Sequence, residues 1–217
     1  MCGPVVTEYE PTEFWPSGSM TLDWALGGGL PQGCYLNLWG NEGTGKTTLA
    51  LLMCKAAVDR GGYAAYVDAE NALDPLWAMR FGLDQESDEP HFVLIQPESA
   101  EEALTAIMLM LKMKHPADQN RSAFDVIILD SIGSMVTNAE LAGKMGDKTV
   151  ASLSQILAQF FKASKTPLRE STTCFVALNQ TRDKFGVSFG YGEQMQQPGG
   201  RSVRFTASII ARMKSQG

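Results

Sequence analysis

The chain has 217 residues, 44% of them hydrophobic and 19% charged, with a formal net charge of −6 at pH 7. This composition predicts an ordinary globular protein with a single core, and four scattered cysteines and two histidines argue against a disulfide framework or a His/Cys metal cluster. No apolar stretch reaches the ~20 residues of a membrane span, and residues 1–10 lack a signal pattern, so we expect a cytoplasmic protein without a membrane partner.

Apolar runs typical of strands alternate with helical patterns along the chain. The predicted strands are Cys34–Trp39, Tyr63–Val67, Phe92–Ile95, Val126–Leu129, Cys174–Leu178 and Ala207–Ala211. The predicted helices are Met20–Leu26, Lys46–Arg60, Pro75–Phe81, Ala100–Met113 and Val150–Lys162, whereas Lys112–Phe124 and Thr181–Arg201 are predicted to be loops. The alternation predicts an α/β fold with a central, mostly parallel sheet and helices on both faces.

A phosphate-binding motif, G-x-x-x-x-G-K-[ST], lies between the first predicted strand and the following helix. Its glycines let backbone N–H groups turn towards a phosphate, and the helix N-terminus adds a partial positive charge. Lys46 is expected to reach the β- and γ-phosphate oxygens, and Thr47 to offer its hydroxyl to Mg²⁺. The predicted nucleotide-binding residues are Gly40, Asn41, Glu42, Gly43, Thr44, Gly45, Lys46, Thr47 and Thr48.

Carboxylates follow two of the predicted strands. Asp130 follows Val126–Leu129 in a Walker-B arrangement, in which a carboxylate orders the water shell of Mg²⁺. Asp68 and Glu70 follow Tyr63–Val67, where a carboxylate could face a γ-phosphate and activate the attacking water. Glu70 is therefore the predicted catalytic base, with capping of the next helix by Asp68 and Glu70 as the alternative.

Amide side chains follow the predicted strand Cys174–Leu178. Asn179 and Gln180 could sense a γ-phosphate there, immediately before the predicted loop Thr181–Arg201. Such a contact would link hydrolysis to the position of that loop. Loops of about 20 residues in compact domains are usually functional.

Charge is unevenly distributed along the chain. Residues 1–138 contain 7 basic and 19 acidic residues, whereas residues 139–217 contain 11 basic and 5 acidic residues. The C-terminal third is therefore the part expected to face a polyanion. The alternative is that its lysines and arginines only solvate helix faces.

Taken in order, the motifs resemble those of the bacterial RecA recombinase family. The matching segments are Gly18–Pro31, Asn41–Thr48, Asp68–Pro75, Asp130-Ser131 and Asn179–Arg182, and the resemblance covers roughly residues 17 to 213. It implies a RecA-like P-loop NTPase with ATP and Mg²⁺ as cofactors, Glu70 activating water and Gln180 acting as a γ-phosphate switch. Asp74 and Trp77 join the nucleotide-binding residues, Trp77 as an aromatic that stacks on adenine; core packing is the alternative for this side chain.

The resemblance also implies two loops that line a DNA path, here Glu140–Val150 and Thr181–Arg201. The predicted DNA-binding residues are Lys144, Lys148, Val150, Arg182, Lys184, Phe185, Phe189 and Arg201. Basic side chains would neutralise phosphates, while Val150 and Phe185 correspond to residues that insert between stacked bases. Packing of Phe189 against its own domain is the alternative.

By resemblance, residues 1–17 form a short segment that could supply a protomer-docking strand, and residues 18–217 form a RecA-like ATPase core. The expected function is a DNA-dependent ATPase of DNA recombination and repair. It would form a filament on single-stranded DNA and exchange strands with double-stranded DNA. Since the usual N-terminal docking helix and C-terminal domain are not found in the sequence, a RecA-like ATP-binding regulator of another recombinase, or an assembly-deficient core, is the alternative. A ring-forming motor or small-molecule kinase is a third interpretation.

Overall fold

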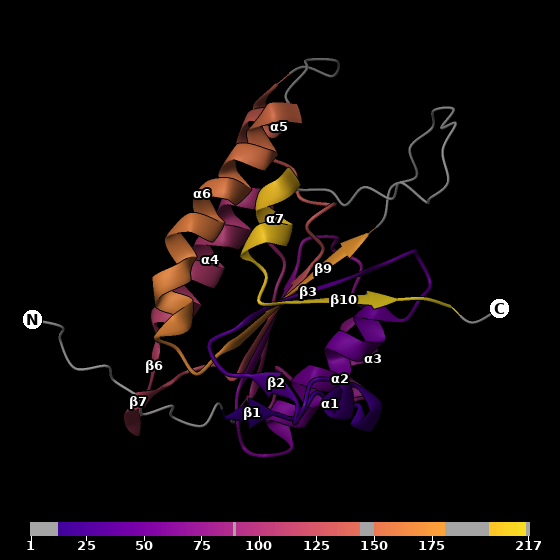
Figure 1. Ribbon diagram of the computed structural model, residues 1–217, viewed down its shortest axis with the longest axis vertical. Coiled ribbons are helices and arrows are strands. Elements are labelled where there is room, and N and C mark those ends of the chain that lie inside the picture. Colours follow the sequence, from indigo (N-terminus) through magenta and orange to yellow (C-terminus); the bar gives the residue numbers. More distant parts are fainter. Residues whose placement is uncertain (1–12, 89, 144–149, 181–199, 216–217) are drawn as a thin grey trace, which may run out of the picture.

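A six-stranded parallel sheet forms the centre of the computed structural model, which describes residues 13–88, 90–143, 150–180 and 200–215 (Figure 1). The strand order is β10-β3-β9-β8-β4-β5. The strands are β3 (Tyr35–Gly40), β4 (Ala64–Asp68), β5 (Phe92–Ile95), β8 (Val126–Asp130), β9 (Cys174–Gln180) and β10 (Ile209–Met213). Because all neighbours are parallel, the carboxyl ends of these strands meet at one edge of the sheet.

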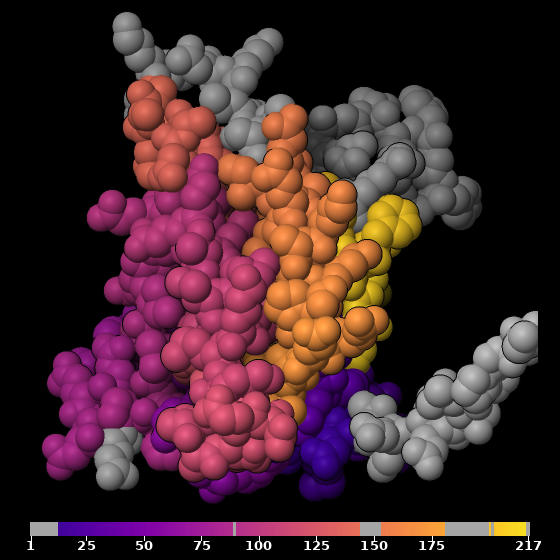
Figure 2. Space-filling model, turned by 90° about the vertical axis from the view of Figure 1, so that its left-hand side faces the viewer, coloured from indigo at the N-terminus to yellow at the C-terminus, as the bar shows by residue number. Residues whose placement is uncertain are grey.

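Helices cover both faces of the sheet, as predicted. They are α1 (Met20–Ala25), α2 (Lys46–Val58), α3 (Pro75–Met79), α4 (Ala100–Lys112), α5 (Asn138–Ala142), α6 (Val150–Arg169) and α7 (Gly200–Thr206). Figure 1 shows α1, α2 and α3 on one face and α4, α6 and α7 on the other. In Figure 2, α4 and α6 lie side by side on the outside of the second layer. The predicted α/β fold is confirmed.

Alternating side chains of the buried strands divide the core into two clusters. In β8, Val126 and Ile128 belong to the cluster that includes Leu51 of α2, whereas Ile127 and Leu129 belong to the cluster formed with α4 and α6. All four strand residues are fully buried, which is why the strand reads as one continuous apolar run. The two clusters pack the sheet between its helical layers.

The prediction of a loop over Lys112–Phe124 is wrong in part, because this segment contains a hairpin. Strand β6 (Lys114–His115) pairs antiparallel with β7 (Asp118–Ser122). All five residues of β7 are polar, so no apolar alternation marks it as a strand. Contacts with the chain before β9 stabilise it instead: the Ser122 backbone N–H donates to Thr172 Oγ1 at 3.0 Å, and the Thr172 N–H donates to Ser122 Oγ at 2.9 Å.

Three helical features also differ from the prediction. Helix α6 continues seven residues beyond the predicted end at Lys162, and α5 and α7 were not predicted. Helix α5 is held by a capping box, in which Thr137 Oγ1 accepts from the Glu140 N–H and Glu140 Oε2 accepts from the Thr137 N–H. Helix α7 begins at Gly200, inside the predicted loop Thr181–Arg201. Both helices are too short to produce a periodic apolar pattern.

The described N-terminal residues pair with their own chain. Strand β1 (Phe14–Trp15) is antiparallel to β2 (Leu30–Pro31), and the Trp15 indole N–H donates to the Thr172 carbonyl at 2.7 Å. Residues 1–12 lie outside the described part, so docking of this segment on another protomer stays a prediction. Cys34, Cys54 and Cys174 are buried free thiols. Among the described residues no helix is long and apolar enough to cross a membrane.

Candidate functional site

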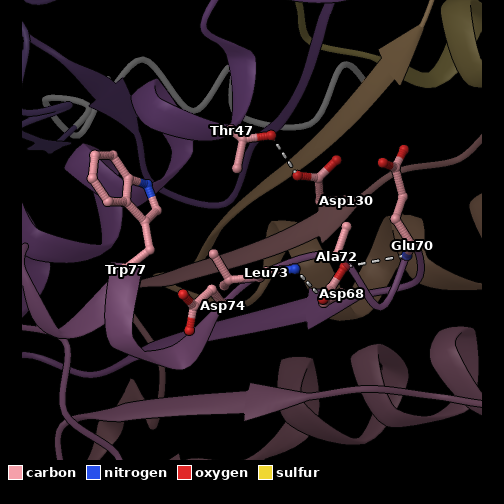
Figure 3. A pocket seen from close by; sticks show the side chains of 8 residues that line it. All are labelled: Thr47, Asp68, Glu70, Ala72, Leu73, Asp74, Trp77 and Asp130. Carbon is pink, nitrogen blue, oxygen red and sulfur yellow. Dashed lines mark hydrogen bonds between the residues drawn. The ribbon is translucent and has the colours of Figure 1, made fainter.

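A cavity of about 440 Å³ opens at the carboxyl edge of the sheet (Figure 3). Its walls come from α2, the ends of strands β4 and β8, the segment that leads into α3, and α3 itself. The lining residues are Thr47, Asp68, Glu70, Ala72, Leu73, Asp74, Trp77 and Asp130. In Figure 3, Trp77 and Asp74 lie at one end, Glu70 lies at the other, and Thr47 and Asp130 lie between them. The volume falls within the range of ordinary small-molecule sites.

The predicted phosphate loop joins β3 to α2 beside this cavity. Gly45, the N-cap of α2, has the left-handed φ of 86° and provides no side-chain hydrogen bond to the helix. The first N–H groups of α2 therefore remain available to an anion. At Gly40 a Cβ would lie 2.5 Å from the Met213 carbonyl oxygen, so the close approach of β10 requires glycine there. These features suit the loop to a phosphate group.

Lys46 is the buried cation of the loop. Its Nζ donates to the carbonyls of Gly40 at 3.1 Å and Asn41 at 2.8 Å, and the residue is 8% exposed. Burial lowers the pKa of Lys46, while the carboxylates of Asp130, Glu70 and Glu42 act in the opposite direction. Because its hydrogen-bond partners are neutral carbonyls, a phosphate oxygen would be a more favourable partner for this ammonium group.

Thr47 and Asp130, the predicted Mg²⁺ residues, are in direct contact. Thr47 Oγ1 donates to Asp130 Oδ2 at 2.8 Å, and the Tyr66 hydroxyl donates to the same oxygen at 2.6 Å. Burial raises the pKa of Asp130; the two hydrogen bonds lower it, and the nearby carboxylates of Glu70 and Asp68 raise it. A hydroxyl and a carboxylate are the kinds of oxygen ligand that Mg²⁺ prefers, and the Thr47 hydroxyl already donates its hydrogen bond to Asp130, which leaves its oxygen lone pairs for a metal. The pair therefore fits a Mg²⁺ ion.

Glu70 is held by two side chains from neighbouring strand ends. Ser131 Oγ donates to Glu70 Oε1 at 2.6 Å, and Gln180 Nε2 donates to the same oxygen at 2.8 Å. The predicted catalytic base and the predicted γ-phosphate sensor, 110 residues apart in sequence, are thus in contact. These two hydrogen bonds orient the Glu70 carboxylate, which does not cap a helix.

Asp74 caps the next helix, α3. The alternative prediction that Asp68 and Glu70 cap this helix is therefore wrong. Asp74 Oδ1 accepts from the Leu76 N–H at 2.9 Å at the start of α3. Asp68 instead stabilises the turn after β4, because its carboxylate accepts from the Leu73 N–H at 2.9 Å and from Gln96 Nε2 at 3.2 Å. This buried carboxylate fixes the path of the chain between Glu70 and Trp77.

Trp77 is 42% exposed and lines the cavity. It forms a T-shaped contact with Phe81, with ring centroids 5.5 Å apart, and the Arg80 guanidinium lies over the indole, 5.5 Å from its centroid. The contact with Phe81 therefore leaves part of the indole exposed to solvent. Part of the indole remains exposed at the cavity, and its stacking on adenine stays a prediction.

Comparison with known proteins identifies the family. Residues 6–217 match the family model of the RecA N-terminal domain. The chain belongs to the RecA family. It is 39% identical to Protein RecA of Thermus thermophilus over 203 residues, which cover 93% of this chain and 56% of that protein. It is 38% identical to Protein RecA of Bifidobacterium breve over 198 residues, which cover 91% of this chain and 47% of that protein. The chain spans about half the length of these curated relatives.

Most predicted DNA-binding residues of this RecA-family chain lie outside the described part: Lys144, Lys148, Arg182, Lys184, Phe185 and Phe189. Val150 is the first residue of α6 and Arg201 the second of α7, and for both only the backbone is described. The structure therefore places the two ends of the predicted loop Thr181–Arg201, at β9 and at α7. The DNA contacts stay predictions.

Two residues of the site were missed by sequence reasoning. Tyr66 contacts Asp130 only because β4 and β8 pair in the register that sets Asp68 opposite Asp130. Burial and the Asp130 carboxylate raise the pKa of Tyr66, so its hydroxyl is a protonated donor. Ser131 follows Asp130 directly, yet its contact with Glu70 also depends on neighbouring strand ends. The sequence signal for Tyr66 was a tyrosine in an otherwise apolar strand, because a buried Tyr hydroxyl usually has a hydrogen-bond partner.

Proposed function

We propose that this RecA-family chain is an ATPase core that binds single-stranded DNA when ATP is bound, hydrolyses ATP faster on DNA, and promotes homologous pairing and strand exchange with double-stranded DNA. Self-association into a filament belongs to the same proposal. The observation that carries it is the 2.8 Å hydrogen bond between Gln180 and Glu70. Gln180 is the last residue of β9, and the predicted DNA loop begins at the next residue.

ATP would lie with its adenine at the Trp77 end of the cavity and its γ-phosphate near Glu70. Lys46 would offset part of the phosphate charge. Thr47 would bind Mg²⁺ directly, and Asp130 would bind it through water. The ion supplies charge neutralisation at the β- and γ-phosphates. Together these groups would fix the triphosphate along the cavity.

Glu70 would accept the proton of the attacking water. In the structure its Oε1 already accepts two hydrogen bonds, one of them from Gln180. A γ-phosphate would offer Gln180 an alternative acceptor, and the amide would turn towards it. That exchange would both release Glu70 for catalysis and move the first residues of the predicted loop Thr181–Arg201. Nucleotide state and DNA binding would thereby be coupled.

Replacing Trp77 with Ala is expected to weaken ATP binding about 10-fold with little change in the turnover of bound ATP, since stacking on one base contributes roughly 1–3 kcal/mol. Titration calorimetry with a slowly hydrolysed ATP analogue measures the change. Trp24→Ala is the matched control, because Trp24 is 84% exposed on α1 and does not line the cavity. Equal effects of the two substitutions would count against adenine stacking by Trp77.

Replacing Phe185 with Ala is expected to weaken single-stranded DNA binding about 10-fold while ATP affinity stays unchanged. Anisotropy of a labelled oligonucleotide, measured with the ATP analogue and with ADP, tests both this residue and the proposed function. Wild-type binding should be tighter with the ATP analogue. Equal loss of DNA and nucleotide binding in the variant would contradict the assignment, and indifference of DNA binding to the nucleotide would contradict the coupling.

A further inference from the structure

Tyr66 combines a buried ring with a polar contact inside the candidate site. The residue is fully buried in β4, and its ring belongs to the core cluster that also contains Leu51 and Cys54 of α2. Its hydroxyl lies 2.6 Å from Asp130 Oδ2 on the adjacent strand. A distance of this length is typical of a hydroxyl that donates to an ionised carboxylate. The ring has a packing role, and the hydroxyl has a separate electrostatic one.

Asp130 Oδ2 accepts from two sides. Tyr66 approaches from the sheet, and Thr47 Oγ1 approaches from the N-terminus of α2 at 2.8 Å. Two donors on different elements restrict rotation of the carboxylate, and neither bond uses Oδ1. Because the Thr47 hydroxyl hydrogen points to Asp130, the oxygen lone pairs of Thr47 are directed away from that carboxylate and can coordinate a metal ion.

We propose that Tyr66 is a positioning residue for Mg²⁺: its hydroxyl holds Asp130 in the orientation that accepts the Thr47 hydrogen bond and presents Oδ1 to the water shell of the ion. This inference rests on the proposed function, because it requires a Mg²⁺-nucleotide at Thr47 and Asp130. Side chains that orient metal-binding groups in this way affect metal affinity without touching the ion. Tyr66 would act on Mg²⁺ binding and leave the contacts of the nucleotide with Lys46 and Trp77 unchanged.

The substitution Tyr66→Phe isolates the hydroxyl, because the ring can remain in the same core cluster. Asp130 would keep its hydrogen bond from Thr47 but lose the one from the sheet. We expect the Mg²⁺ concentration for half-maximal binding of N-methylanthraniloyl-ADP to rise about 10-fold, and binding in EDTA to stay within about twofold of wild type. Fluorescence titration of the full chain with Mg²⁺ at fixed nucleotide concentration gives the first value, and nucleotide titration in EDTA gives the second.

Tyr35→Phe is the matched control. Tyr35 lies on β3, is 1% exposed, and among the described residues its hydroxyl has no hydrogen-bond partner. It belongs to the other core cluster and does not line the cavity. This control should leave the Mg²⁺ midpoint unchanged. Both variants should keep a native circular dichroism spectrum and a cooperative thermal transition, with the lower midpoint in Tyr66→Phe, because only that variant loses a hydrogen bond.

An unchanged Mg²⁺ midpoint in Tyr66→Phe would overturn the inference. So would an equal loss of affinity with and without Mg²⁺, because that result means a disturbed pocket, and so would wild-type binding that does not depend on Mg²⁺. These three outcomes leave nucleotide binding by the wild type intact. A wild-type chain that binds no nucleotide under any of these conditions would instead contradict the proposed function, and the inference with it.

Discussion

Replacing Glu70 with Gln is expected to lower ATP turnover by about 100-fold or more while ATP affinity stays within about twofold of wild type. Glutamine has the size of glutamate, and its Oε1 can still accept from Ser131 and Gln180, the two donors that contact Glu70. Its amide cannot accept the proton of the attacking water, however. Single-turnover hydrolysis, together with calorimetric titration of the ATP analogue, separates the chemical step from binding.

Glu170→Gln is the matched control for this experiment. Glu170 is exposed and lies between α6 and β9, at the amino edge of the sheet and therefore opposite the cavity. Its substitution should leave both turnover and affinity unchanged. Turnover in Glu70→Gln within a few-fold of wild type would contradict the role of Glu70 as the base.

Replacing Lys46 with Ala is expected to weaken ATP binding about 100-fold, since two charge-assisted hydrogen bonds to phosphate oxygens together contribute on the order of 3 kcal/mol. Lys46 is the buried cation beside the cavity, and its hydrogen bonds in the structure go to the carbonyls of Gly40 and Asn41. Calorimetric titration with the ATP analogue gives the affinity, and hydrolysis should become too slow to measure at ordinary ATP concentrations.

Lys55→Ala separates the position of Lys46 from the mere loss of a positive charge. Lys55 lies on the same helix, more than two turns after Lys46. It forms an ion pair with Asp59 at the exposed C-terminal end of α2. Its removal should leave ATP affinity unchanged. Equal weakening by both substitutions would indicate a general electrostatic effect and would argue against direct phosphate contact by Lys46.

The part of the site that could be predicted from sequence is the part that is local or follows from parallel strands. The predicted phosphate loop is contiguous from Gly40 to Thr48, so its residue types and spacing are sufficient to propose its role. Asp130 and Glu70 were placed correctly at strand ends, because apolar runs precede both. The parallel-sheet prediction then implied that these ends share one edge.

What could not be predicted depends on which strands are neighbours and in which register they pair. Tyr66 contacts Asp130 because β4 pairs with β8, and Gln180 reaches Glu70 across the end of β8. No short-range pattern contains that information. The hairpin β6–β7 was missed for a different reason: polar side chains fill β7, and its stabilising contacts with Thr172 are remote in sequence.

The proposed coupling between the nucleotide site and DNA through Glu70 and Gln180 is tested most directly by ATP hydrolysis with and without a long single-stranded DNA at increasing salt. We predict strong stimulation by DNA at low salt that falls as salt rises, because contacts of basic residues with phosphates release counterions. Glu70→Gln should show no comparable stimulation. Wild-type turnover that is the same with and without DNA at every salt concentration would contradict the coupling.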